Sequence, residues 1–379
     1  MRRFLFVAAN EWSNWGGSEL LWSLTAEKLA SRGNDVRVSF RNYGEPPREI
    51  ERVRSAGAQI FERRAPSFFV RQVRRVFPPP KHSDLQLDTV GKDVDLMVIS
   101  QGYVGDGLEW MEAAGATGIR YVVIVQCASE SYWPDDSTAK RLATGFENAA
   151  QTYFVSQATL DLTRRQFATP LRQAKVIRNP FNVRYDVNPP WPSGSSEELN
   201  LGCVGRLDLA HKGQDLLLGV LSLPHWRERN VQVSLIGRGR NESVLRCMAD
   251  LLELRNVAFM GHQQNIQAIW KSHHALVLPT RFEGMPLVVV EAMLCGRPCI
   301  ATDVAGCREL IRDGINGFLA KAATVEMLDE AMNRAWDNRS QLREIGAQAA
   351  IDVRQFVSHD PAEDFVRELG SLVDGHARE

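Results

Sequence analysis

The chain has 379 residues, 44% hydrophobic and 24% charged, so it is long enough for two domains and has the composition of a globular protein. Its 45 basic and 46 acidic residues give a formal net charge of −1, which argues against a polyanion such as nucleic acid as partner. Any anion must therefore be bound by a local cluster of charges.

The cysteines and the amino terminus indicate the compartment. The six cysteines form no CxxC pair, and four lie in apolar runs or expected helices, so we interpret them as reduced core thiols of a cytoplasmic protein. The start, MRRFLFVAAN, is similar to a signal peptide, but its apolar run is short and a Gly-Gly loop follows. We interpret it as a first strand. No stretch approaches the length of a transmembrane helix.

Short apolar strands alternate with helical stretches along the chain, the pattern of parallel α/β sheets. In the first half, a helix is expected over residues 18–31, and Gly33 closes its carboxyl end. Strands are expected in the first half over residues 4–9, 35–40, 95–100, 121–126 and 152–155. A second series of strands is expected over residues 199–205, 231–237, 256–260, 275–279 and 299–302.

The stretch NPFNVRYDVNPPWPSGSSEE separates the two series and has the composition of a linker. We therefore predict a domain over residues 1–180, a linker over 181–198, a second domain over 199–351 and a helical segment over 352–379. Both domains are expected to be doubly wound and Rossmann-like, with ligands bound between them at the carboxyl ends of the strands.

The stretch FERRAPSFFVRQVRRVFPPPK, residues 61–81, has six basic residues against one acidic, interleaved with four phenylalanines. Residues 68–77 are expected to form a short amphipathic helix with Arg71, Arg74 and Arg75 on one side. This composition suits an anionic membrane surface or a phosphate-bearing lipid. The alternative is a surface excursion whose aromatic side chains pack on the domain and whose arginines are solvated.

The stretch VGRLDLAHKGQDLLL places Arg206, Lys212 and the start of a helix after a strand that ends at Gly205. Two cations and helix amides suit a diphosphate. Alternatively, both cations are solvated loop charges. The next strand ends at Gly237 in a GxG sequence, which either permits close approach to a ligand or is only a turn.

The stretch RFEGMPLVVVEAMLCGRP holds Glu283 just before a helix expected over residues 287–295, and Glu291 in the helix middle. A carboxylate in an apolar helix is costly unless something pairs with it. Vicinal diols of a sugar and of a ribose would satisfy both acids. Alternatively, Glu291 pairs with an arginine and Glu283 caps the helix. The free amides of the first turn lie near four residues, Gly284, Met285, Pro286 and Leu287.

Together these motifs resemble glycosyltransferase family 4 (group 1). The Gly-Arg-Leu and Lys-Gly pairs, the Glu-x7-Glu spacing and ATDVAGCRELIRDGINGFL follow that family's order over most of residues 199–320. The first half matches more loosely, through Gly16, Gly17 and the strand plan. The resemblance implies the GT-B fold, with two Rossmann-like domains facing across a cleft, and retaining transfer from a nucleotide-diphosphate sugar. The first domain would lie on the acceptor side, the second would bind the nucleotide sugar, and residues 352–379 would return to the first domain.

The resemblance also implies roles for single residues. Arg206 and Lys212 would hold the donor diphosphate, Glu283 would contact the donor sugar hydroxyls, and Glu291 would contact the ribose hydroxyls. The donor site would be completed by Gly17, Gly237, Gly284, Met285, Pro286 and Leu287. Trp12 and Trp15, beside the Gly-Gly loop, either stack on an acceptor sugar or pack under the loop.

The sequence departs from the family at Gln126, where members often carry a histidine near the donor sugar. Glutamine forms hydrogen bonds but cannot titrate. Activity is kept if the histidine acts by hydrogen bonding, and suffers if proton transfer is needed. Because the leaving diphosphate can itself take the acceptor proton, we expect an active enzyme whose catalytic residues are Glu283, Gln126, Arg206 and Lys212.

We expect no cofactor and no metal, because Asp93 and Asp95 lie at a strand entrance, the wrong end for ligands. The expected partners are a nucleotide-diphosphate sugar and a saccharide or lipid-linked acceptor. The protein is expected in the cytoplasm, peripherally on the inner face of the membrane if residues 61–81 bind it. One rival is a non-catalytic nucleotide-sugar binding protein of the same fold. An oxidoreductase is disfavoured by the absence of GxGxxG after the first strand.

Overall fold

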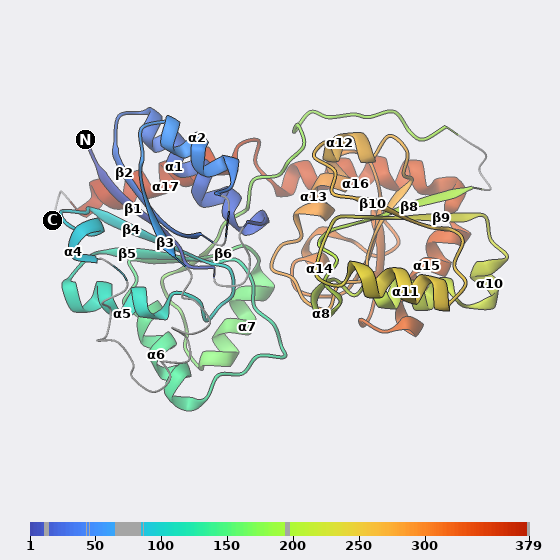
Figure 1. The fold of residues 1–379 in the computed structure, drawn as a ribbon, viewed down its shortest axis with the longest axis horizontal. Coiled ribbons are helices and arrows are strands. Elements are labelled where there is room, and N and C mark those ends of the chain that lie inside the picture. The colour runs from blue at the N-terminus through green and yellow to red at the C-terminus, as the bar shows by residue number, and fades with distance from the viewer. Residues whose placement is uncertain are drawn as a thin grey trace. The chain divides into compact units, whose positions relative to one another are not determined.

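The computed structural model describes residues 1–10, 15–42, 44, 46–64, 85, 87–193 and 198–376. The chain divides into two compact units, Met1–Pro180 with Asp360–Glu379, and Phe181–His359. Each unit is built on one parallel sheet with helices on both faces (Figure 1). The prediction of two Rossmann-like domains is therefore confirmed.

The first unit contains a seven-stranded sheet in the order β3-β2-β1-β4-β5-β6-β7. Its strands are β1 (Arg3–Ala8), β2 (Asp35–Asn42), β3 (Gln59–Arg64), β4 (Leu96–Gln101), β5 (Tyr121–Val125), β6 (Gln151–Phe154) and β7 (Ala174–Val176). The sequence reading missed β3 and β7. Neither forms an apolar run, because β3 reads QIFERR and β7 has only three residues.

Both faces of this sheet are buried. Because successive strand residues point to opposite sides, each strand contributes side chains to both faces. In β1, Phe4 and Phe6 pack with one set of helices, whereas Leu5 and Val7 pack with the other. Figure 1 shows α1, α2 and α17 on one face and α5, α6 and α7 on the other. The helices are η1 (Gly17–Glu19), α1 (Leu20–Ser31), α2 (Arg48–Ser55), α4 (Leu87–Val90), α5 (Leu108–Thr117), α6 (Asp136–Glu147), α7 (Gln157–Phe167) and α17 (Pro361–His376).

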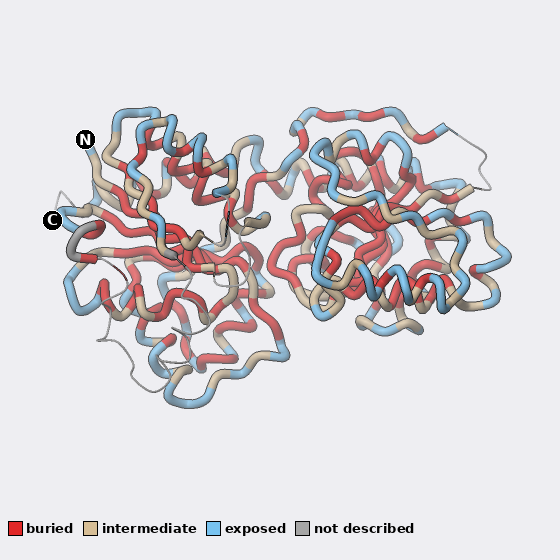
Figure 2. Tube along the Cα trace, viewed as in Figure 1, coloured by how far each residue is buried: buried red, intermediate tan, exposed pale blue. Residues whose placement is uncertain are grey.

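The second unit contains a six-stranded sheet in the order β10-β9-β8-β11-β12-β13. Its strands are β8 (Leu199–Val204), β9 (Val231–Ile236), β10 (Val257–Gly261), β11 (Ala275–Leu278), β12 (Cys299–Thr302) and β13 (Gly317–Ala320). Its helices are α8 (Leu209–Lys212), α9 (Gln214–Leu221), α10 (Pro224–Arg227), α11 (Glu242–Leu251), α12 (Ile266–Ile269), α13 (Leu287–Leu294), α14 (Cys307–Leu310), α15 (Val325–Asp337), η3 (Arg339–Gln341) and α16 (Leu342–Phe356). The strands form the buried centre of each unit (Figure 2).

Each strand order changes direction once, between β1 and β4 in the first sheet and between β8 and β11 in the second. In doubly wound sheets, ligands bind outside the carboxyl ends of the strands at this switch point. The loops that follow these four strands are therefore the places where each unit is expected to hold a ligand.

The segment assigned as a linker from its composition is bound to the second unit. Arg297, only 2% exposed, donates hydrogen bonds to the carbonyl oxygens of Pro190 (2.6 Å), His273 (3.0 Å) and Cys295 (2.9 Å). Burial lowers the pKa of Arg297 to about 10, so the guanidinium stays charged at neutral pH.

A second arginine, Arg354 of α16, binds the same segment. It donates to the carbonyl oxygens of Tyr185 (3.2 Å) and Val187 (3.0 Å), and the hydroxyl of Tyr185 donates back to the carbonyl of Arg354 (2.8 Å). A proline-rich stretch offers few backbone donors but keeps every carbonyl acceptor. Two arginines can therefore hold it without regular secondary structure.

The basic stretch 61–81 is only partly described. Residues 61–64 belong to β3, which pairs with β2. Arg63 donates to the carbonyl of Ala8 and lies 5.3 Å from the ring centre of Trp110, so this arginine packs on the domain. The predicted helix over 68–77 lies outside the described residues. None of the helices in the described part of the chain is long and apolar enough to span a bilayer.

Replacing Arg297 with methionine is expected to lower the free energy of unfolding by about 2–4 kcal/mol, because several buried carbonyls lose their donor. Urea unfolding followed by circular dichroism measures the change. The matched control is Arg343→Met, at an exposed position of α16 in the same unit. Equal midpoints for the two variants would contradict the anchoring role of Arg297.

Candidate functional site

Two loops flank the switch point of the second sheet. The loop after β8 carries Arg206 and leads into α8, which ends at Lys212. The loop after β11 carries Glu283 and leads into α13. Residues 71 positions apart in sequence are thus brought to one edge of one sheet.

The two loops touch through their backbones. Gly213 has a positive φ of 62°, and a Cβ atom there would lie 2.0 Å from the carbonyl oxygen of Pro279. The carbonyl of His211 accepts hydrogen bonds from the backbone N–H of Arg281 (2.8 Å) and the hydroxyl of Thr280 (3.0 Å). Only glycine fits position 213, which explains the Lys-Gly pair in structural terms.

A bidentate ion pair fastens the same loops. The guanidinium of Arg281 binds both carboxylate oxygens of Asp215, at 2.8 and 2.7 Å, and also the carbonyl of Leu209 at 2.6 Å. Asp215 lies in the first turn of α9, where a carboxylate is also favoured by the helix dipole. Sequence reasoning missed this pair. The sequence signal for it was one opposite charge beside each candidate residue: Asp215 lies three residues after Lys212, and Arg281 lies two residues before Glu283.

Lys212 and Glu283 form a buried ion pair, with Nζ 2.5 Å from Oε1 and the side chains only 15% and 7% exposed. His211, stacked on Phe282, places Nε2 3.6 Å from Oε2, too far for a hydrogen bond. Burial would raise the pKa of Glu283, but the attraction of Lys212 and His211 holds it well below its usual range. Glu283 is therefore ionised at neutral pH.

This geometry decides two of the open alternatives. Lys212 is not a solvated loop charge. Glu283 does not cap α13, because Pro286 occupies the N-cap position and makes no side-chain cap hydrogen bond. By contrast, the side chain of Arg206 is exposed, and its backbone carbonyl accepts a hydrogen bond from Gln214 (2.7 Å). Donor binding by these residues stays a prediction.

Gly237 has a structural reason to be glycine. Its φ is 150°, and a Cβ atom there would lie 1.9 Å from the carbonyl oxygen of Gly205. Gly239 makes a similar close approach to the carbonyl of Leu207, at 2.3 Å. The GxG sequence therefore packs the end of β9 against the loop after β8.

Glu291 is buried in the middle of α13, 4% exposed, and its partner is a neutral amide. Oε1 accepts hydrogen bonds from the backbone N–H and the side-chain amide of Asn182, both at 2.9 Å. The alternative that Glu291 pairs with an arginine is wrong. Burial raises the pKa of Glu291 to about 7, against the opposing effect of the two hydrogen bonds.

In the first unit, Gln126 follows β5 and is paired with Asn179. The amide of each donates to the carbonyl oxygen of the other, at 3.2 and 2.6 Å, and both residues are buried. These bonds use one of the two amide hydrogens of Gln126 and one of its two lone pairs. Contact of Gln126 with a sugar stays a prediction.

The Gly-Gly loop after β1 leads into η1, which begins at Gly17. Next in the chain, Glu19 is buried and accepts a hydrogen bond from the side-chain amide of Asn10 (3.2 Å). Trp15 packs edge-on against Trp22 with ring centres 5.8 Å apart, in agreement with the packing alternative. Trp12 lies outside the described residues.

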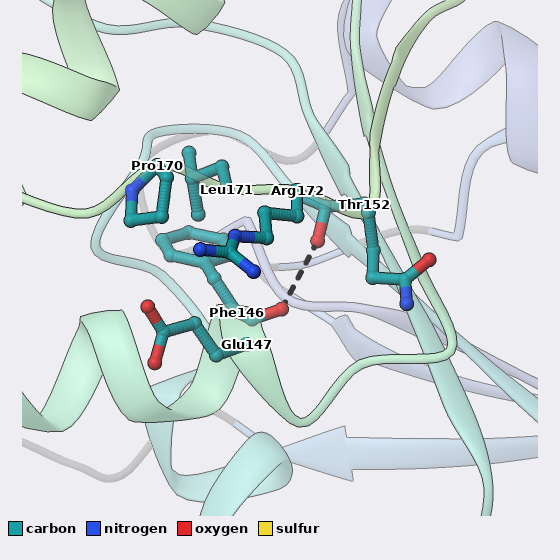
Figure 3. Close-up of a pocket in the computed structure, with 7 residues that line it drawn as sticks. Phe146, Glu147, Thr152, Pro170, Leu171 and Arg172 are labelled. Carbon is teal, nitrogen blue, oxygen red and sulfur yellow. Dashed lines mark hydrogen bonds between the residues drawn. The ribbon is translucent and has the colours of Figure 1, made fainter.

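A cavity of about 380 Å³ in the first unit lies at the other end of its sheet. Figure 3 shows it beside the start of β6, where the hydroxyl of Thr152 donates to the carbonyl of Phe146 (3.3 Å). It is lined by Phe146, Glu147, Thr152, Pro170, Leu171, Arg172 and Gln173. Because ligands of parallel sheets bind at the carboxyl ends, this cavity does not belong to the candidate site.

No three His, Cys, Asp or Glu side chains within the described ranges are grouped so as to hold a metal ion. Asp95, considered at the sequence level, binds Arg3 instead, with Oδ1 2.8 Å from Nη2.

Comparison with known proteins identifies the second unit. Residues 198–338 match the family model described as glycosyl transferases group 1. This part of the chain is a glycosyl transferases group 1 domain. An uncharacterized glycosyltransferase of Haemophilus influenzae is 29% identical over 137 residues, which are 36% of this chain and 38% of the relative.

The lipopolysaccharide 1,6-galactosyltransferase of Salmonella typhimurium is 31% identical over 170 residues, 42% of this chain and 45% of the relative. The chain thus matches less than half the length of these relatives. Among solved structures, Anabaena HepE in complex with UDP and glucose has a TM-score of 0.75 at 19% identity, covering 98% of this chain and 100% of that one. At this identity the likeness shows the fold, and the predicted GT-B fold is confirmed.

Replacing Lys212 with methionine is expected to destabilise the protein by about 3–5 kcal/mol, because it leaves a buried charge without its partner. Adding Glu283→Gln to that variant should recover part of the loss. Chemical denaturation of both variants measures the coupling between the two side chains. Lys271→Met, at an exposed position of the same unit, is the control, and an equal loss in both lysine variants would refute the pairing.

The raised pKa of Glu291 predicts a pH-dependent stability. The native state keeps this proton up to about pH 7, whereas the unfolded carboxyl loses it near 4.5, so stability falls as pH rises through that window. The stability of Glu291→Gln relative to wild type should therefore rise by about 3 kcal/mol between pH 4.5 and 7.5. Unfolding titrations at several pH values test this. Glu330→Gln, exposed on α15, should show no such trend.

Proposed function

We propose that this protein is a glycosyltransferase that moves a sugar from a nucleotide-diphosphate sugar to a saccharide or lipid-linked acceptor with retention of configuration. One observation carries the proposal. Within the group 1 domain, Arg206, Lys212 and the ionised Glu283 lie on the two loops that flank the sheet's switch point. Cations and a carboxylate at such a position suit a ligand with a diphosphate and a polyol.

In this proposal Arg206 holds the diphosphate as a bidentate fork, because its side chain is exposed beside the strand end. Lys212 gives one N–H to Glu283 and has two more for phosphate oxygens. Glu283, kept ionised by Lys212, accepts hydrogen bonds from the hydroxyls of the donor sugar. Glu291 offers Oε2 to the ribose hydroxyls, since both bonds from Asn182 go to Oε1.

The proposed reaction breaks the bond between the anomeric carbon and the diphosphate oxygen, and forms one to the acceptor oxygen on the same face. The acceptor proton passes to an oxygen of the leaving diphosphate. Arg206 and Lys212 stabilise the charge that develops on this group, so the proposal needs no metal ion. Gln126 takes part through a hydrogen bond and transfers no proton.

The comparisons support the substrate classes of the proposal. Anabaena HepE binds UDP and glucose, and the Salmonella relative is named for galactosyl transfer in lipopolysaccharide. We extend these properties to this chain as a nucleotide-sugar donor and a saccharide or lipid-linked acceptor. A lipid-linked acceptor would place the protein at the inner face of the membrane.

Calorimetry without added metal, with UDP-, GDP- and ADP-sugars, tests donor binding. One donor is expected to bind, and Arg206→Ala should weaken it by roughly 10- to 100-fold, because a charge-assisted bidentate contact is lost. Glu291→Ala should weaken it as well. The control, Arg255→Ala, removes an exposed arginine that precedes β10, at the opposite edge of the sheet. Binding that ignores Arg206 and Glu291 would refute the donor site.

Catalysis is separated from binding by nucleotide release. A transferase frees nucleotide when acceptor is supplied, and proton NMR of the product gives its anomeric configuration. Tight donor binding with no release for any acceptor would favour the rival reading of a nucleotide-sugar binding protein.

A further inference from the structure

An exposed tryptophan lies on the loop between β5 and α6 of the first unit. Trp133 is 61% exposed, and it is the one aromatic residue among the strongly exposed large hydrophobic side chains of the described ranges. Its indole N–H donates to the carbonyl of Glu130 at 3.0 Å. This bond fixes the orientation of the ring while its apolar surface stays in water, an arrangement that a ligand would stabilise.

The loop that carries Trp133 is held in place by hydrogen bonds from Gln166 and by the packing of Tyr132. The side-chain amide of Gln166 donates to the carbonyls of Ser129 (2.7 Å) and Tyr132 (2.5 Å). The ring of Tyr132 packs edge-on against Tyr103, with centres 5.5 Å apart. A platform that is already ordered loses little conformational entropy when a ligand binds.

The position of the loop places Trp133 at the ligand-binding edge of the first sheet. The loop begins after the carboxyl end of β5, and Trp133 follows Gln126 by seven residues. Tyr103, which supports it, follows the carboxyl end of β4 at the switch point. In the proposed function the donor residues Arg206, Lys212, Glu283 and Glu291 belong to the second unit, and the first unit is taken to hold the acceptor.

The charge of the loop selects the kind of ligand. Residues 127–137 carry three exposed carboxylates, Glu130, Asp135 and Asp136, and no lysine or arginine. Asp135 already caps α6 by accepting from the backbone of Thr138 (2.9 Å), and Glu130 lies 3.7 Å from the exposed Arg165. Net negative charge repels an anionic membrane or an acidic sugar, whereas carboxylates accept hydrogen bonds from uncharged hydroxyls.

We propose that Trp133 is the stacking platform for the acceptor, and that the acceptor presents an uncharged pyranose ring there. The apolar C–H face of the ring would lie on the indole, while Glu130 and Asp136 accept hydrogen bonds from its hydroxyls. This inference rests on the proposed function, because it assigns the acceptor class of that same enzyme.

Saturation-transfer NMR tests the inference with methyl glucoside, methyl galactoside, methyl N-acetylglucosaminide and methyl glucuronide as probes. Protons on one face of a neutral ring should receive saturation from the wild type, and Trp133→Ala should weaken the best probe roughly tenfold. Trp133→Phe should retain most of the binding. Leu251→Ala, which removes an 82% exposed side chain in the other unit, should have no effect.

Two further measurements separate the possible failures. Calorimetry with the nucleotide sugar should give equal donor affinity for Trp133→Ala and wild type. If the donor binds but no neutral glycoside shows binding that depends on Trp133, the inference is overturned and the proposed function stands; if the wild type binds no donor, the proposed function fails. The inference is equally overturned if Trp133→Ala loses co-sedimentation with phosphatidylglycerol vesicles instead, or if the glucuronide binds better than the neutral probes.

Discussion

The ion pair between Lys212 and Glu283 is the interaction on which the candidate site depends. A carboxylate so deeply buried would take up a proton without a cation beside it, and the lysine is fixed there by the backbone contact at Gly213. The Arg281–Asp215 pair joins the same two loops. The Lys212–Glu283 pair, the backbone contact at Gly213 and the Arg281–Asp215 pair therefore all hold the two loops together.

Two glutamates eight residues apart, one on the loop before α13 and one within this helix, are both buried yet differ in electrostatic character. Glu283 faces a cation and stays charged, whereas Glu291 faces the neutral amide of Asn182 and has a pKa of about 7. Burial acts in the same direction on both, so the partner decides the outcome. A ligand that brings hydroxyl groups would meet a permanent acceptor at Glu283 and an acceptor that titrates near neutral pH at Glu291.

Local patterns were enough to predict the fold but not the contacts of the site. Apolar runs located ten of the strands, since a strand buried on both faces must be apolar. They missed β3, β7 and β13, which are short or mixed in polarity. Motif spacing selected Lys212 and Glu283, but their contact arises from tertiary packing over 71 residues. Asn182 could not be found, because its segment has the composition of a linker.

The anchoring of residues 181–193 by Arg297 and Arg354 bears on how such a protein can exchange parts with its relatives. Three of the carbonyls that these arginines bind, those of Tyr185, Val187 and Pro190, lie before β8, so a recombination point placed at residue 199 would separate them from their donors. The natural joints are before Phe181 and after His359, where the chain passes from one unit to the other. If the second unit is inherited as one piece, it therefore includes the segment that precedes β8, and the two arginines and this segment would have to change together.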